Sequence, residues 1–150
     1  MAATTPISER VHIAIFGRTN DGKSTLMNRL VGHDVAIVSD KPGTTTDPVQ
    51  KALEVNGLGA AVLVDTPGLD DTTELGGERM ARTAKVLDKT DIAIVLFSSA
   101  EGASQLRIIE ECRIREIPTI VVLNKVDATT NLEATVNSLS ALTKHRVIAI

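Results

Sequence analysis

Aromatic side chains are almost absent from this 150-residue sequence, which has two phenylalanines and neither tyrosine nor tryptophan. Proteins that hold single-stranded nucleic acid stack bases on such side chains, so a stacking platform is not expected. The charge points the same way, because 19 acidic against 16 basic residues leave a net charge of −3. No broad electropositive face is implied, and nucleic acid is not the partner that the composition favours.

Cysteine is equally scarce, since Cys112 stands alone. It cannot form an intrachain disulfide, and one thiol cannot hold a zinc ion or an iron–sulfur cluster. We therefore expect a reducing, cytoplasmic setting and no iron–sulfur cluster in this segment. The longest apolar runs, such as Ile92–Phe97, are too short to span a bilayer, and no membrane partner is expected. Residues 1–8 do not have the pattern of a secretory signal and are predicted to be a flexible tail.

Short runs rich in valine and isoleucine alternate with longer amphipathic stretches. Such runs are typical of strands buried on both faces of a parallel sheet, and the stretches have the spacing of helices. The order predicts an α/β fold, a three-layer sandwich around a mostly parallel sheet. The predicted strands are Val11–Phe16, Ala61–Val64, Ile92–Phe97, Thr119–Leu123 and Val147–Ile150; the predicted helices are Ser24–Val31, Glu78–Asp88, Ser104–Glu116 and Leu132–Leu142.

One further strand has a different pattern. Val49–Val55 alternates in polarity, and turn residues follow at Asn56–Gly59. This predicts a hairpin and one antiparallel edge strand. The sequence ends at Ile150 within a run typical of a core strand, which a further helix should cover. We therefore expect residues 9–150 to form a single domain that is truncated near its C-terminal end.

Residues 17–24 match the phosphate-loop pattern GxxxxGK[ST] between a predicted buried strand and a predicted helix. Backbone N–H groups of such a loop surround a phosphate, and the helix N-terminus favours anions. Lys23 can reach the β- and γ-phosphates, and the Ser24 hydroxyl can ligate Mg²⁺. A glycine turn that only caps a helix is the structural alternative. The residues predicted to bind the nucleotide here are Gly17, Asn20, Asp21, Gly22, Lys23, Ser24 and Thr25.

A second motif, Asn124-Lys125-Val126-Asp127, follows a predicted strand directly, at the edge of the sheet where open α/β folds bind ligands. The Asp127 carboxylate can accept from N1–H and from the exocyclic amino group of guanine, and adenine offers neither donor there. Asn124 can bridge to the phosphate loop, and the Lys125 stem can cover the base. A polar loop with an aspartate helix cap is the alternative. After a phosphate loop the motif predicts GTP and GDP as ligands.

A magnesium ligand and two nucleotide-sensitive segments are also predicted. Asp65 follows a predicted strand and can hold Mg²⁺ through water, and the Gly68 N–H can contact a γ-phosphate that hydrolysis removes. The hydroxyl-rich loop of residues 41–47 can supply a threonine to the same ion. Residues 32–47 and 66–77 are therefore predicted to be the mobile segments.

The residue after Gly68 is Leu69, which cannot orient a water molecule. No arginine finger is evident within the chain, so we predict slow intrinsic hydrolysis. The water must be oriented by another acidic side chain, by a bound cation or by a partner. The acidic candidates are Asp70, Asp71, Glu74 and Glu78.

In this order the motifs resemble the translation-factor-related GTPases, within them the branch of tRNA-modification, Era-type and ribosome-assembly GTPases. Asn20 in the phosphate loop and Leu69 after Gly68 mark that branch. In its potassium-activated members an asparagine at the Asn20 position ligates K⁺, which resembles an arginine finger in charge and place. The resemblance implies K⁺ ligands in Asn20, the Ser39 and Lys41 carbonyls and Thr44, and Mg²⁺ ligands in Ser24, Thr45 and Asp65. The residues predicted to act in hydrolysis are Lys23, Asn20, Thr45, Gly68 and Glu74.

A narrower resemblance extends over residues 9–150. Residues 36–49 are similar to switch I of the FeFe-hydrogenase maturation GTPases, the HydF family. Most tRNA-modification relatives read Gly-Thr-Thr-Arg-Asp here, whereas Thr46 replaces the arginine and Pro48 follows the aspartate. The likeness implies a small-GTPase G domain that regulates assembly of the di-iron cluster on a scaffold. The implied partners are C-terminal dimerisation and cluster-binding domains, radical-SAM maturases, the hydrogenase and a second copy.

Two alternatives to this interpretation remain. One is an RNA-linked GTPase of the tRNA-modification or ribosome-assembly type, against which the acidic balance and Thr46 argue. The other is a module in which the nucleotide is only structural, against which the intact Lys23, Ser24 and Asp65 argue.

Overall fold

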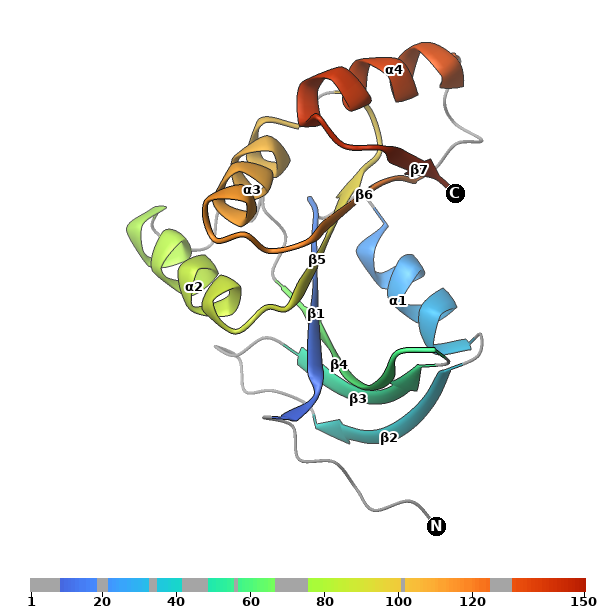
Figure 1. Cartoon of the computed structure of the whole chain (residues 1–150), viewed down its shortest axis with the longest axis vertical. Helices are drawn as coiled ribbons and strands as arrows, with labels where there is room; N and C mark the ends of the chain where they lie inside the picture. Colours follow the sequence, from blue (N-terminus) through green and yellow to red (C-terminus); the bar gives the residue numbers. More distant parts are fainter. Residues whose placement is uncertain are drawn as a thin grey trace.

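The computed structural model describes residues 9–18, 22–32, 35–41, 49–55, 57–66, 76–100, 102–124 and 131–150. Its centre is a seven-stranded sheet in the order β2-β3-β4-β1-β5-β6-β7, with helices on both faces (Figure 1). The strands are β1 (Val11–Phe16), β2 (Val35–Lys41), β3 (Val49–Val55), β4 (Gly59–Asp65), β5 (Ile92–Phe97), β6 (Thr119–Leu123) and β7 (Val147–Ala149). The helices are α1 (Lys23–Gly32), α2 (Gly76–Asp88), α3 (Ala103–Ile114) and α4 (Leu132–Thr143).

The predicted α/β fold class is confirmed. Strands β4, β1, β5, β6 and β7 pair in parallel, and β3 runs antiparallel to β4. All four predicted helices form, with ends that differ from the prediction by at most two residues.

The edge of the sheet differs from the sequence prediction. Strand β2 was not predicted, and it pairs antiparallel with β3, so that β3 is the second strand and not the edge. The β2 sequence loses its apolar character after Val38, and the pairing shifts register between Ile37 and Ser39. The sequence of residues 35–41 therefore does not show the regular alternation of polar and apolar residues from which a strand is predicted. Within residues 32–47, predicted to be a mobile segment, residues 35–41 enter the sheet as β2, and residues 33–34 and 42–47 lie outside the described residues.

Two apolar clusters fill the space between the sheet and its helices. The larger one joins the sheet to α2, α3 and α4 and includes Phe97 and Cys112. The smaller one joins the opposite face to α1 and includes Leu26 and Met27. Both phenylalanines of the sequence, Phe16 and Phe97, are fully buried, so the few aromatic side chains serve the core. Cys112 is also buried within the larger cluster, and burial raises the pKa of its thiol.

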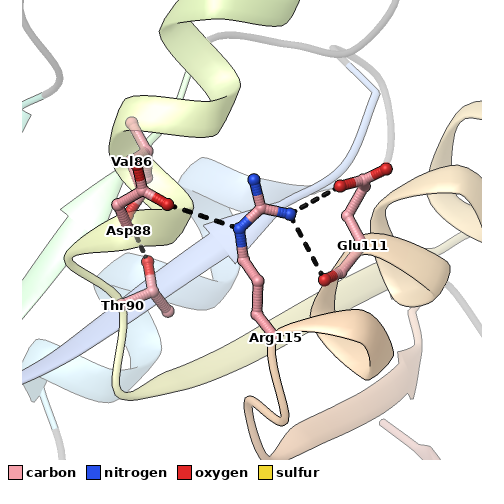
Figure 2. Close-up of polar contacts among 5 residues, drawn as sticks. All are labelled: Val86, Asp88, Thr90, Glu111 and Arg115. Carbon is pink, nitrogen blue, oxygen red and sulfur yellow. Dashed lines mark hydrogen bonds and ion pairs between the residues drawn. The ribbon is translucent and has the colours of Figure 1, made fainter.

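Polar contacts fix the end of the sheet that is opposite to the phosphate loop. The Arg10 guanidinium is buried before β1 and donates to the Leu53 carbonyl at 3.0 Å. On the α2–α3 side, the Arg115 guanidinium donates to Asp88 at 3.4 Å and to Glu111 (Figure 2). The hydrogen bond with Glu111 raises the pKa of Arg115. The contact between Arg115 and Asp88 joins the C-terminal ends of α2 and α3, and α2 begins within the last residues of the second predicted nucleotide-sensitive segment.

No helix in the described part of the chain combines the length and the apolar character that a membrane crossing requires.

Candidate nucleotide site

The described residues of the phosphate-loop motif, 17–18 and 22–24, lie at the end of β1 and at the start of α1. Gly22 has a φ angle of +92°, a left-handed conformation that favours glycine. Its carbonyl accepts the Leu26 N–H at 2.9 Å and so opens α1. Gly17, directly after β1, is buried, and a Cβ atom there would lie 3.3 Å from both the Leu96 Cβ and the Lys23 Cγ. Gly22 thus suits its backbone conformation, and Gly17 lets the chain pass close to Leu96 and Lys23.

Lys23, the first residue of α1, is the centre of the site. Its side chain is largely buried, with 10% of its surface exposed, and Nζ donates to Asp65 Oδ1 at 3.2 Å. Nζ also donates to the Thr66 carbonyl. The structure therefore brings together two predicted residues that are 42 positions apart. The Asp65 side chain is 29% exposed and stays accessible from the solvent side.

Thr66 is a site residue to which the sequence analysis gives no role beyond its place at the start of the segment 66–77. Its side chain is buried, and its hydroxyl donates to the Ile15 carbonyl at 2.7 Å. This bond ties the end of β4 to β1, where Ile15 and Asp65 are paired in register. Its position directly after Asp65 was the available signal, but no pattern indicated that its carbonyl would accept from Lys23.

The guanine motif begins at the same edge of the sheet. Asn124, directly after β6, is buried, and its N–H donates to the Phe97 carbonyl at 2.7 Å. This bond continues the β5–β6 pairing by one residue and places Asn124 beside the end of β5. Lys125 and Asp127 lie outside the described residues.

The remaining predicted residues divide into three groups. Ser24 and Thr25 are exposed in the first turn of α1. Ser39 and Lys41 lie in β2, paired with Ala52 and Gln50, and β2 is three strands from β1 in the sheet order, so the structure does not bring them to the phosphate loop. The third group lies outside the described residues: Asn20, Asp21, Thr44, Thr45, Gly68 and Glu74, with the other candidate water-orienting residues Asp70 and Asp71.

Within the described ranges, no three His, Cys, Asp or Glu side chains gather closely enough to hold a metal ion. A magnesium ion that arrives with a nucleotide needs few protein ligands, because phosphates and waters complete its octahedral shell. One exposed hydroxyl, from Ser24, and one part-exposed carboxylate, from Asp65, fit that requirement.

Comparison with known proteins gives matches over the part of the chain that contains the phosphate-loop motif. A profile of the 50S ribosome-binding GTPases matches residues 12–125. The chain is 36% identical over 123 residues to the tRNA modification GTPase MnmE of Nitrosomonas europaea, covering 81% of the chain and 27% of that protein. It is 41% identical over 125 residues to the GTPase Der of Campylobacter concisus, covering 80% of the chain and 27% of that protein.

A solved structure is also similar. A crystal structure of Aquifex aeolicus Era bound to GDP and AlF4⁻ superposes with a TM-score of 0.67 at 27% identity, covering 93% of this chain and 50% of that one. The chain thus spans about a quarter of the length of the two curated relatives above.

Proposed function

The chain belongs to the 50S ribosome-binding GTPase family, and on that premise we propose that it is the GTP-driven switch of an RNA-linked protein. That the chain is a GTPase domain, which binds and hydrolyses GTP, follows from the family match and from the relatives. That its partner is linked to RNA is our proposal, and it rests on the functions that the names of the relatives state.

The observation that carries the proposal is the contact between Lys23 and the end of β4. An ammonium group largely withdrawn from water, with one carboxylate partner, is a strong electrostatic site for a second anion. A nucleotide phosphate at the start of α1 would compete with Asp65 for Lys23 and would meet the N–H groups that the helix leaves unpaired. The Asp65 carboxylate, once released, could turn to a magnesium ion. Mg²⁺ supplies charge neutralisation of the phosphates, and Ser24 and Asp65 are the described residues that would hold it.

We propose guanine specificity from the position of the second motif. The bond from the Asn124 N–H to the Phe97 carbonyl fixes the first residue of that motif at the end of β6. Asp127, three residues later, would accept from the two donors that distinguish guanine from adenine. A nucleoside triphosphate would thus lie across the ends of β1 and β6, with its phosphates at α1.

Potassium is expected to accelerate this domain. We predict that GTP hydrolysis in KCl exceeds that in NaCl at equal ionic strength by tenfold or more, because a cation beside the phosphates would offset the missing arginine finger. Binding through the Ser39 and Lys41 carbonyls would require this part of β2 to move, because β3 and β4 lie between β2 and β1 in the sheet. The measurement is phosphate release under single turnover, with Asn20→Ala, which should lose only the potassium-dependent part.

Equal rates in the two salts would contradict potassium activation. The water-orienting group would then have to be an acidic residue after Gly68 or a partner. In either salt we expect slow turnover, and a rate typical of a metabolic ATPase would contradict the expectation of slow intrinsic hydrolysis.

The RNA-linked role predicts nucleotide-dependent RNA binding. We expect the chain loaded with a non-hydrolysable GTP analogue to bind purified tRNA or ribosomal subunits at least fivefold more tightly than the GDP-loaded chain. Fluorescence anisotropy with labelled tRNA and sedimentation with subunits measure this difference. Lys23→Ala, which should not respond to the nucleotide, is the control, and equal binding in both states would contradict the role.

Hydrogenase maturation is the second candidate, and one sequence observation favours it. Thr46 and Pro48 depart from the switch of the tRNA-modification branch and resemble that of the hydrogenase-maturation family. No relative reported above bears that name. This candidate predicts no preference for RNA in either nucleotide state and GTP-dependent binding to an iron–sulfur scaffold or a radical-SAM maturase. Pull-down with these purified proteins, in GTP analogue and in GDP, separates it from the RNA-linked role.

A further inference from the structure

The carboxyl end of β5 lies between the two halves of the site. On one side, a Cβ on Gly17 would lie 3.3 Å from the Leu96 Cβ and 3.4 Å from the Leu96 carbonyl oxygen. On the other side, the Phe97 carbonyl accepts the Asn124 N–H at 2.7 Å. Movement of Leu96 would therefore move the start of the phosphate loop, and movement of Phe97 would move the start of the guanine motif.

The Leu96 carbonyl lies where β1 leaves the sheet. The β1–β5 register ends with Phe16 opposite Val95, so Leu96 is the next residue of β5 after the pairing stops. Successive carbonyls of a strand point to opposite neighbours, and because the Phe97 carbonyl faces β6, the Leu96 carbonyl faces β1. A buried carbonyl at the end of a ladder still requires a donor.

Gln105 of α3 supplies that donor. Its Nε2 donates to the Leu96 carbonyl at 3.3 Å, and the side chain is fully buried. A buried primary amide is uncommon among core residues, and this one lies in the first turn of α3. A Cβ on Gly102 would lie 2.8 Å from Gln105 Oε1 and 2.6 Å from a ring carbon of Phe97. Gly102 therefore leaves the room that lets Gln105 pass the Phe97 ring to reach the strand.

We propose that Gln105 is a positioning residue of the phosphate loop. Its amide donates to the Leu96 carbonyl just beyond the last paired residues of β1 and β5, and so it holds the backbone against which Gly17 packs as the chain turns toward α1. Gln105 does not touch the nucleotide; it acts through Leu96 and Gly17. The inference rests on the proposed function, because it concerns the site that would hold the phosphates of GTP.

The test replaces Gln105 by methionine, which has a similar length and no donor. We expect the affinity for fluorescent GDP to fall about tenfold, mostly through faster dissociation, since loss of one buried hydrogen bond changes an equilibrium by this order. The ratio of affinities for GDP and inosine diphosphate should stay unchanged, because the substitution acts on the phosphate loop and not on the residues that contact the base. Ile109→Val is the matched control, one turn further along α3 and equally in the core; it should lower thermal stability and leave GDP affinity within twofold.

Three outcomes would overturn the inference. Gln105→Met could fold and bind GDP within twofold of the wild type, its affinity loss could be matched by Ile109→Val, or its GDP-to-inosine-diphosphate ratio could change and so place the effect at the base. If the methionine variant does not fold, Gln105→Asn keeps the amide on a shorter side chain and should show the same loss. Failure of the proposed function is a separate result, since the wild-type chain itself would then not bind GDP.

Discussion

The Lys23→Ala variant is expected to lose at least about 100-fold in single-turnover GTP hydrolysis, the order found when one preorganised charged or donor group is removed from a reacting site. Lys23 Nζ is the cation at the start of α1 that the structure places within 3.2 Å of Asp65. Because the side chain is largely buried, solvent does little to weaken its interaction with a phosphate. Rapid-quench measurement of phosphate release, with enzyme in excess over GTP, gives the rate.

The control for this prediction is a lysine of the same chemistry outside the site. Lys85 is exposed in the last turn of α2, and Lys85→Ala should leave hydrolysis within twofold of the wild type. Lys23→Arg adds a second comparison, because it keeps the charge with a planar head that does not replace a point charge; we expect it to remain at least tenfold impaired. A Lys23→Ala rate within threefold of the wild type would exclude Lys23 from the chemistry.

Gly22→Ala is expected to weaken GDP binding by tenfold or more and to lower the free energy of unfolding by about 1–2 kcal/mol. The stability loss is the usual penalty for a Cβ in the left-handed region, which Gly22 occupies at a φ of +92°. The binding loss has a separate cause. Gly22 opens α1 through its bond to Leu26, and relief of strain at this residue would turn the first N–H groups of the helix away from a bound phosphate. Thermal denaturation and isothermal titration with GDP measure the two effects.

Gly57→Ala separates the two effects. Gly57 has a φ of +85° in the turn between β3 and β4, and a Cβ there would meet nothing within 4 Å. It should cost a similar amount of stability, yet leave GDP affinity unchanged, because the turn is at the opposite end of β4 from Asp65. A Gly57→Ala variant that weakens GDP binding as much as Gly22→Ala would show that the binding loss is a general effect of lowered stability.

The local features of this protein were readable from its sequence because they depend on short-range physics. The short runs of β-branched residues predicted buried strands, and the three-to-four spacing of Glu78–Asp88 and Leu132–Leu142 predicted helices of an α/β domain. The phosphate-loop and guanine motifs predict a nucleotide site from residue type and spacing alone. Glycine at position 22 is part of the phosphate-loop pattern, and its positive φ was added by the structure.

Contacts between distant segments were decided only by the tertiary structure. Strand β2 exists because β3 offers it an unpaired edge, and no pattern within residues 35–41 indicates that pairing. Nothing local shows that the Thr66 carbonyl would accept from Lys23, 43 positions away, or that Gln105 would reach the end of β5. The residue types fix what each side chain can do, but which partner it meets depends on how β1, β4 and β5 end beside one another, and that follows from packing the whole sheet.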